Sequence, residues 1–144
     1  MCNPSFDTVQ VGDELPPLEL PPVDRRMLAL FAGASGDHNP IHIDLDFARR
    51  AGMPDVFAQG MLGMAWLGRL LTQWAPQAQL RRFDVRFQGI TQLGDAVRCS
   101  GRVVEKLQHQ SQPCVRVQVQ SVTQDRQIKI AGEALVALPS SSRT

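Results

Sequence analysis

An aspartate and a histidine five residues apart are the side chains of this sequence best suited to acid–base chemistry. Asp37 and His42 lie in the segment GDHNPIH, residues 36–42. Pro40, between them, has no backbone N–H and keeps the preceding Asn39 away from helical geometry, so a shaped loop is predicted. An imidazole exchanges protons near neutral pH, and a carboxylate beside it could hold the same water molecule. We therefore predict that Asp37 and His42 form a catalytic pair.

The second feature is an apolar stretch that starts at Gly60 and continues to Trp74. It is long enough for about four helical turns, and a helix that is apolar on nearly every side is a buried one. The N–H groups of its first turn have no partners inside the helix and carry the positive end of the helix dipole. The Gly60 N–H is therefore a candidate donor to a carbonyl oxygen that gains negative charge. Three apolar side chains could line a substrate pocket, although core packing is their commoner fate: Met61, Leu62 and Trp66.

Less specific roles are open to the same residues. Asp37 could cap a loop and His42 could be a structural histidine, while Asn39 is expected to hold the loop through side-chain-to-backbone hydrogen bonds. His38 and His42 have a spacing that places two metal ligands on one face of a helix, but Pro40 argues against a helix here. No metal site is predicted.

Composition limits the class of protein. A chain of 144 residues with 43% apolar and 20% charged residues fits one globular domain, residues 1–144, with 1–14 and 139–144 expected to be loose. A net charge of +1 argues against a nucleic-acid-binding protein. The sequence shows no secretory signal and no apolar run long enough for a membrane span, so a cytoplasmic protein is predicted. The cysteines lack metal or redox spacing and are expected to be free thiols: Cys2, Cys99 and Cys114.

The order of the predicted elements indicates an α+β fold. Asp24 is predicted to cap a helix that runs through Phe31, and the long apolar helix is expected to end near Trp74 because Pro76 stops it. From about Leu80 onward apolar and polar residues alternate, which predicts strands. A long helix followed by antiparallel strands predicts a sheet wrapped around that helix. The later strands are predicted at residues 96–107, 113–124 and 127–138.

The loop and the helix start together resemble the signature of the MaoC-like, or type 2, (R)-specific enoyl-CoA hydratases. That signature joins a serine-glycine-aspartate loop, an asparagine-proline pair and a histidine to a helix led by glycine. The final segment GEALVALP, residues 132–139, is similar to the family's last strand. The family usually has a histidine where this chain has Gln59. The matching residues are Phe31, Ser35, Gly36, Asp37, Asn39, Pro40, Ile41, His42, Asp44, Ala48, Gly60, Met61 and Leu62.

The resemblance implies a hotdog fold, a curved antiparallel sheet around a long central helix, assembled as a homodimer or a dimer of dimers. It also implies the reversible hydration of a trans-2-enoyl thioester to an (R)-3-hydroxyacyl thioester in fatty acid metabolism. Asp37 and His42 would both hold the water, which would add syn. The substrate would be an acyl-CoA or an acyl-carrier-protein thioester, and the chemistry implies neither cofactor nor metal. Several arginines could meet the phosphates of coenzyme A: Arg81, Arg82, Arg86, Arg98 and Arg102.

Two other functions fit a hotdog domain. An acyl-CoA thioesterase would direct a carboxylate-activated water at the carbonyl carbon and release a free thiol. A non-catalytic subunit of a heterodimeric dehydratase would bind the acyl thioester and act only with a partner. The pairing of Asp37 with His42 favours the hydratase, which is the leading prediction.

Overall fold

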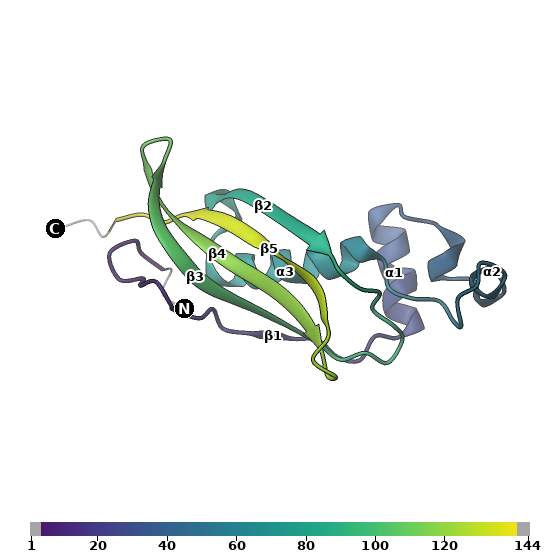
Figure 1. Ribbon diagram of the computed structural model, residues 1–144. Helices are drawn as coiled ribbons and strands as arrows, with labels where there is room; N and C mark the ends of the chain where they lie inside the picture. Colours follow the sequence, from purple (N-terminus) through teal and green to yellow (C-terminus); the bar gives the residue numbers. More distant parts are fainter. Residues whose placement is uncertain (1–3, 141–144) are drawn as a thin grey trace.

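An antiparallel sheet that curves around one long helix forms most of the chain in the computed structural model, which describes residues 4–140 (Figure 1). The sheet has the strand order β1-β3-β4-β5-β2, and all neighbouring strands are antiparallel. The predicted α+β architecture is confirmed. The strands are β1 (Leu18–Glu19), β2 (Leu80–Phe87), β3 (Val97–His109), β4 (Gln112–Thr123) and β5 (Ile128–Ala137). The helices are α1 (Arg25–Ser35), α2 (Leu45–Arg50) and α3 (Gly60–Trp74), with 3-10 turns η1 (Pro40–His42) and η2 (Gln77–Gln79).

The helix α3 packs on the apolar face of the sheet and contacts β3, β4 and β5. This face is apolar because β4 alternates buried valines with polar residues that stay in solvent. The helix contributes leucines to the same core, with Leu67 and Leu70 almost completely buried. The resulting core holds α3 in place and so fixes the position of its first residue.

The prediction that α3 is a buried helix is confirmed for the side that packs on the sheet and is wrong for the opposite side. Met61 is 55% exposed, and Ala65 and Arg69, at successive spacings of four residues, are exposed on the same side. Methionine, alanine and glycine count as apolar in a sequence, yet they tolerate a solvent-facing side without a large cost. The helix therefore has one buried side against the sheet and one open side.

The first described residues lie beside the sheet at the end where β5 finishes (Figure 1). The Phe6 N–H donates to the Pro139 carbonyl at 3.0 Å, and Lys106 Nζ donates to the carbonyls of Phe6 and Val9. The two segments expected to be loose, 1–14 and 139–144, are described only in part. Residues 1–3, which include Cys2, and residues 141–144 lie outside the described residues. None of the helices within residues 4–140 has the length and hydrophobicity that crossing a membrane requires.

Candidate active site

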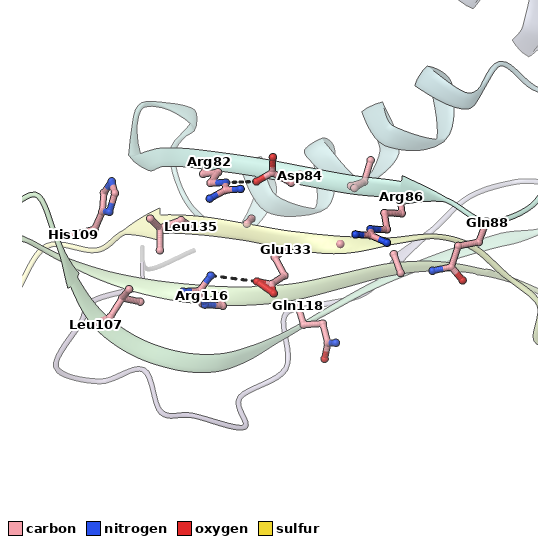
Figure 2. Close-up of a pocket in the computed structure, with 14 residues that line it drawn as sticks. Arg82, Asp84, Arg86, Gln88, Leu107, His109, Arg116, Gln118, Glu133 and Leu135 are labelled. Carbon is pink, nitrogen blue, oxygen red and sulfur yellow. Dashed lines mark hydrogen bonds and ion pairs between the residues drawn. The ribbon is translucent and has the colours of Figure 1, made fainter.

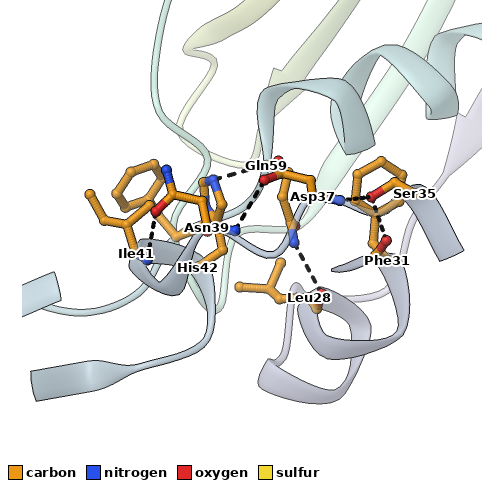
Figure 3. Close-up of polar contacts among 9 residues, drawn as sticks. Leu28, Phe31, Ser35, Asp37, Asn39, Ile41, His42 and Gln59 are labelled. Atoms are coloured by element: carbon orange, nitrogen blue, oxygen red, sulfur yellow. Dashed lines mark hydrogen bonds and ion pairs between the residues drawn. The ribbon is translucent and has the colours of Figure 1, made fainter. Parts of the chain in front are cut away.

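Asp37 is placed by the end of helix α1. Gly36 adopts a left-handed conformation (φ 76°), which turns the chain sharply out of the helix. Ser35 Oγ donates to the Phe31 carbonyl at 2.7 Å and accepts from the Asp37 N–H at 3.1 Å (Figure 3). The Asp37 carboxylate in turn accepts from the Asn39 N–H at 3.3 Å through Oδ1. These contacts hold the carboxylate in one orientation while 40% of the side chain stays exposed.

The segment between Asp37 and His42 is a tight turn. Asn39 Oδ1 accepts from the Ile41 N–H at 3.1 Å, so the amide side chain caps the short 3-10 turn η1. Pro40 occupies the first position of that turn, where a missing N–H costs nothing. The turn brings His42 back toward Asp37.

His42 is held by a contact that the sequence did not predict. Its Nδ1 lies 2.8 Å from the carbonyl oxygen of Phe57, and its ring meets the Phe57 ring edge-on with centroids 5.0 Å apart. A carbonyl oxygen can only accept a hydrogen bond, so Nδ1 carries the proton. In the neutral imidazole Nε2 is then left with a free lone pair. The side chain is 11% exposed, and Nε2 is the nitrogen that faces Asp37.

The pair is spaced for a shared water. Asp37 Oδ2 and His42 Nε2 are 4.0 Å apart, which is too far for a direct hydrogen bond. A single water at about 2.8 Å from each atom fits across this gap. Both atoms are acceptors, so such a water would donate both of its protons to the pair and leave its lone pairs free. This arrangement can activate a water as a nucleophile.

Helix α3 supplies the third predicted group. Gly60 is its first residue, so the Gly60 N–H has no acceptor within the helix, and the side chain of the preceding Gln59 does not cap it. The N–H also lies at the positive end of a 15-residue helix. A Cβ on Gly60 would lie 3.2 Å from the ring of Phe87, so the chain passes close to β2 here. The site therefore combines a carboxylate, an imidazole and a backbone N–H that has no acceptor within its helix.

Two hollows open at this site. One, of about 450 Å³, joins Asp37 to Met61 and to the open side of α3. The other, of about 320 Å³, lies beside Gly60, and Phe87 is one of the residues that line it. Of the predicted substrate-binding residues Met61 lines the first hollow. Leu62 and Trp66 line neither, because both are buried in the core, and a substrate contact for them stays a prediction.

A hollow of about 580 Å³, larger than either of these two, lies elsewhere. It is on the sheet face opposite α3 and includes none of the three predicted catalytic residues (Figure 2). Its charged side chains largely neutralise each other: Arg116 binds Glu105 and Glu133, and Arg82 pairs with Asp84. Most of the charged side chains that line this hollow are therefore paired.

Phe57 and Ser35 are the site residues whose roles sequence reasoning missed. Phe57 acts through its backbone carbonyl. Every residue has one, so the residue type does not indicate this role. Ser35 belongs to the loop motif, and its hydroxyl spacing to Asp37 was the available signal. Within residues 4–140 no three His, Cys, Asp or Glu side chains gather in a way that could hold a metal ion.

Known proteins are similar to this chain in sequence and in architecture. Residues 9–125 match the family described as the MaoC like domain. The solved structure of the R-hydratase PhaJ1 from Pseudomonas aeruginosa, unliganded, shares 27% identity and a TM-score of 0.82 over 96% of this chain and 88% of that chain. An (R)-hydratase from A. caviae involved in PHA biosynthesis shares 25% identity and a TM-score of 0.79 over 92% and 98% of the two chains.

A curated relative is also similar. The Solanum lycopersicum protein named 3-hydroxyacyl-(acyl-carrier-protein) dehydratase FERN, mitochondrial, is 27% identical over 104 residues, which are 72% of this chain. The match spans 63% of the length of that relative.

Proposed function

Because this chain belongs to the MaoC-like domain family and has its hotdog fold, we propose that it hydrates a trans-2-enoyl thioester reversibly to an (R)-3-hydroxyacyl thioester. The observation that carries this proposal is the orientation of His42. Its Nδ1 proton is committed to the Phe57 carbonyl, and its Nε2 faces the Asp37 carboxylate across a gap of 4.0 Å. A water held there is deprotonated as it attacks, which is what hydration of an activated double bond requires.

The reaction is a proton transfer around one water. The water oxygen bonds to C3 of the enoyl group, and its proton passes to His42 Nε2. The π electrons of the C2–C3 bond move toward the thioester carbonyl, whose oxygen gains negative charge and accepts from the Gly60 N–H. The protonated His42 then returns a proton to C2 on the same face, and the imidazole is neutral again. Each acid–base group is worth about 10²–10⁴-fold in rate, and one oxyanion donor is worth about 10²–10³-fold.

The substrate class follows from the surroundings of the pair. The hollow that contains Asp37 is lined mainly by apolar side chains, including Phe31 and Phe83, which suits an acyl chain. Acyl groups carried by coenzyme A and by an acyl-carrier protein present the same thioester to these residues. All the groups used in the mechanism are protein groups, so the proposed reaction needs neither cofactor nor metal.

The proposed enzyme is a homodimer in which two copies of the chain pair through strand β2. Strand β2 is one of the two edges of the sheet, and within residues 4–140 no further strand pairs with its outer N–H and C=O groups. Beside this edge Met61 and Phe87 are 55% and 52% exposed, which is costly for large apolar side chains in water. Pairing of two β2 edges would continue the sheet and cover this side of α3.

The test follows the loss of the substrate and the release of free thiol in parallel. Purified protein is mixed with crotonyl-CoA, the enoyl-thioester absorbance is recorded, and a thiol reagent reports free coenzyme A in a matched tube. We expect the enoyl band to fall without thiol release, and both Asp37→Asn and His42→Ala to abolish that loss. Thiol release would instead identify a thioesterase. Activity that appears only after a partner subunit is added would identify the heterodimeric alternative.

A further inference from the structure

We propose that Gln59 is a positioning residue that sets the place of the Gly60 N–H relative to Asp37 and His42, an inference that rests on the proposed hydratase function. Gln59 immediately precedes α3, and only 1% of its surface is exposed. Its Nε2 donates to the backbone carbonyl of Leu28 at 3.1 Å (Figure 3). Because water is excluded from the bond, no solvent molecule can replace it at low cost.

This hydrogen bond joins the two elements that carry the reacting groups. Leu28 lies in α1, whose end leads directly into the Asp37 loop. Gln59 is the N-cap residue of α3, and the next residue is Gly60. A change in the separation of α1 and α3 would move the oxyanion donor relative to the water-activating pair. Displacements of about 1 Å at a reacting centre can cost about 10²-fold in rate.

Gln59 is also the last of three consecutive residues that are each anchored to a different segment. The Phe57 carbonyl accepts from His42 at 2.8 Å, and the Ala58 N–H donates to the Thr91 carbonyl at 2.9 Å. Gln59 adds the bond to α1. Phe57 and Ala58 form their hydrogen bonds through backbone groups, whereas Gln59 uses its side chain. A substitution at Gln59 can therefore remove its hydrogen bond and leave the other two.

The amide oxygen of Gln59 indicates that this side chain does more than fill space. Gln59 Oε1 is buried and has no hydrogen-bond partner among the described residues. A buried acceptor without a partner lowers stability, whereas methionine would fill a similar volume without that cost. What glutamine adds over methionine at this position is the Nε2 donor, and its bond is to Leu28.

The first test compares two methionine variants. Gln59→Met removes the donor and keeps the side-chain length. Gln79→Met is the matched control, because Gln79 lies beyond the other end of α3 and its Oε1 is likewise buried without a partner. We expect Gln59→Met to lower kcat about 10–100-fold with less than about a threefold change in KM, and Gln79→Met to leave both unchanged. An unchanged kcat in folded Gln59→Met, or a loss confined to KM, overturns the proposal.

The second test uses Gln59→Glu, in which lowering the pH restores a hydrogen-bond donor at position 59. A glutamic acid at position 59 can donate to the Leu28 carbonyl only when protonated, and burial favours the protonated form. The kcat of Gln59→Glu, divided by that of the wild type at the same pH, should rise at least about tenfold between about pH 8 and pH 6. A ratio that at pH 6 is still as low as that of Gln59→Met overturns the proposal, because a restored donor would then not restore the activity.

A third measurement separates this inference from the proposed function. If the wild type hydrates no enoyl thioester, the hydratase proposal fails, but amide hydrogen exchange still reports on the start of α3. We expect exchange of the Leu62 N–H, which donates to the Gln59 carbonyl at 3.1 Å, to speed up at least about tenfold in Gln59→Met and to stay unchanged in Gln79→Met. Equal exchange in the two variants means that Gln59 does not position the helix start, and the inference falls whatever the activity.

Discussion

The carboxylate of Asp37 and the imidazole of His42 face each other across 4.0 Å, with Oδ2 and Nε2 as the nearest atoms. The two residues differ in how they are held. Asp37 is held by hydrogen bonds to residues two positions away in the sequence. His42 is held by the carbonyl of Phe57, 15 residues further along the chain. The gap between Asp37 and His42 therefore depends on both local and distant structure, and it is the size that a shared water requires.

If one water is shared, the losses from Asp37 and His42 will not add. Asp37→Asn and His42→Ala are each expected to lower kcat/KM about 10²–10⁴-fold, because either change leaves the water with one acceptor. The double variant should be no more than about tenfold below the weaker single variant, since the second change removes a group that no longer has a function. Steady-state rates of the four proteins measure this. Fully multiplicative losses would show that the two residues act in separate steps.

Gly60 can be tested by removing its N–H without removing the helix. Proline is well tolerated at the first position of a helix, and Gln59 already has the extended geometry (φ −59°, ψ 134°) that a following proline requires. Gly60→Pro is expected to lower kcat about 10²–10³-fold by loss of the oxyanion donor. Rates with crotonyl-CoA measure the effect.

The matched control for that experiment is Gly60→Ala. Its Cβ meets the Phe87 ring at 3.2 Å, as the proline Cβ would, but the N–H remains. Phe87 is half exposed, so its ring can move aside. Gly60→Ala should therefore keep most of the activity. If both variants lose activity equally, the close approach of the chain at Gly60 matters and the N–H does not.

The elements with local signals were predicted well from the sequence. Asp24 caps α1 by accepting from the Met27 N–H at 2.7 Å, and α3 ends at Trp74, just before Pro76. Strand β4 and the first half of β3 also follow the predicted period of two, whereas the last four residues of β5 are all buried. Caps, prolines and alternation are properties of neighbouring residues, and so they can be read without knowledge of the fold.

The contacts that complete the candidate site were not predictable in the same way. His42 is oriented by the Phe57 carbonyl, and Gln59 binds the Leu28 carbonyl. Both acceptors are backbone oxygens, which are present at every residue, so their roles arise only after the fold brings the segments together. The open side of α3 was missed for a related reason, because composition does not show which side of a helix has no neighbour.

Two glycine-to-alanine changes should have opposite effects on stability. A Cβ on Gly132 in β5 would lie 2.0 Å from the Asp84 carbonyl oxygen and 2.7 Å from the Val85 Cα of β2. Because backbone cannot move aside cheaply, Gly132→Ala is expected to lower the free energy of unfolding by about 2–3 kcal/mol. Gly33→Ala in α1 meets nothing within 4 Å and should raise it by about 0.5–1 kcal/mol. Urea unfolding of both variants measures the difference, and a stable Gly132→Ala would mean that β2 shifts freely.

Cys99 should make the protein less stable at alkaline pH. Burial, helped by the negative charge of Glu19, raises the pKa of the Cys99 thiol from 9.0 to about 12. Above pH 9 the unfolded chain loses this proton while the folded chain keeps it, so the free energy of unfolding should fall as the pH rises from 9 toward 12, by at most about 1.4 kcal/mol per pH unit. Below pH 9 both states keep the proton, and the effect is absent.

The alkaline effect can be isolated by comparing the wild type with Cys99→Ala at pH values between about 8 and 11. The variant should be less stable by about 1 kcal/mol near neutral pH, because it loses a buried sulfur atom. It lacks the thiol that titrates only after unfolding, so its disadvantage should shrink as the pH rises. The difference between the two unfolding curves cancels the titration of the lysines, which both proteins share. A difference that stays constant with pH would show that the Cys99 thiol ionises as readily in the folded protein as in the unfolded chain.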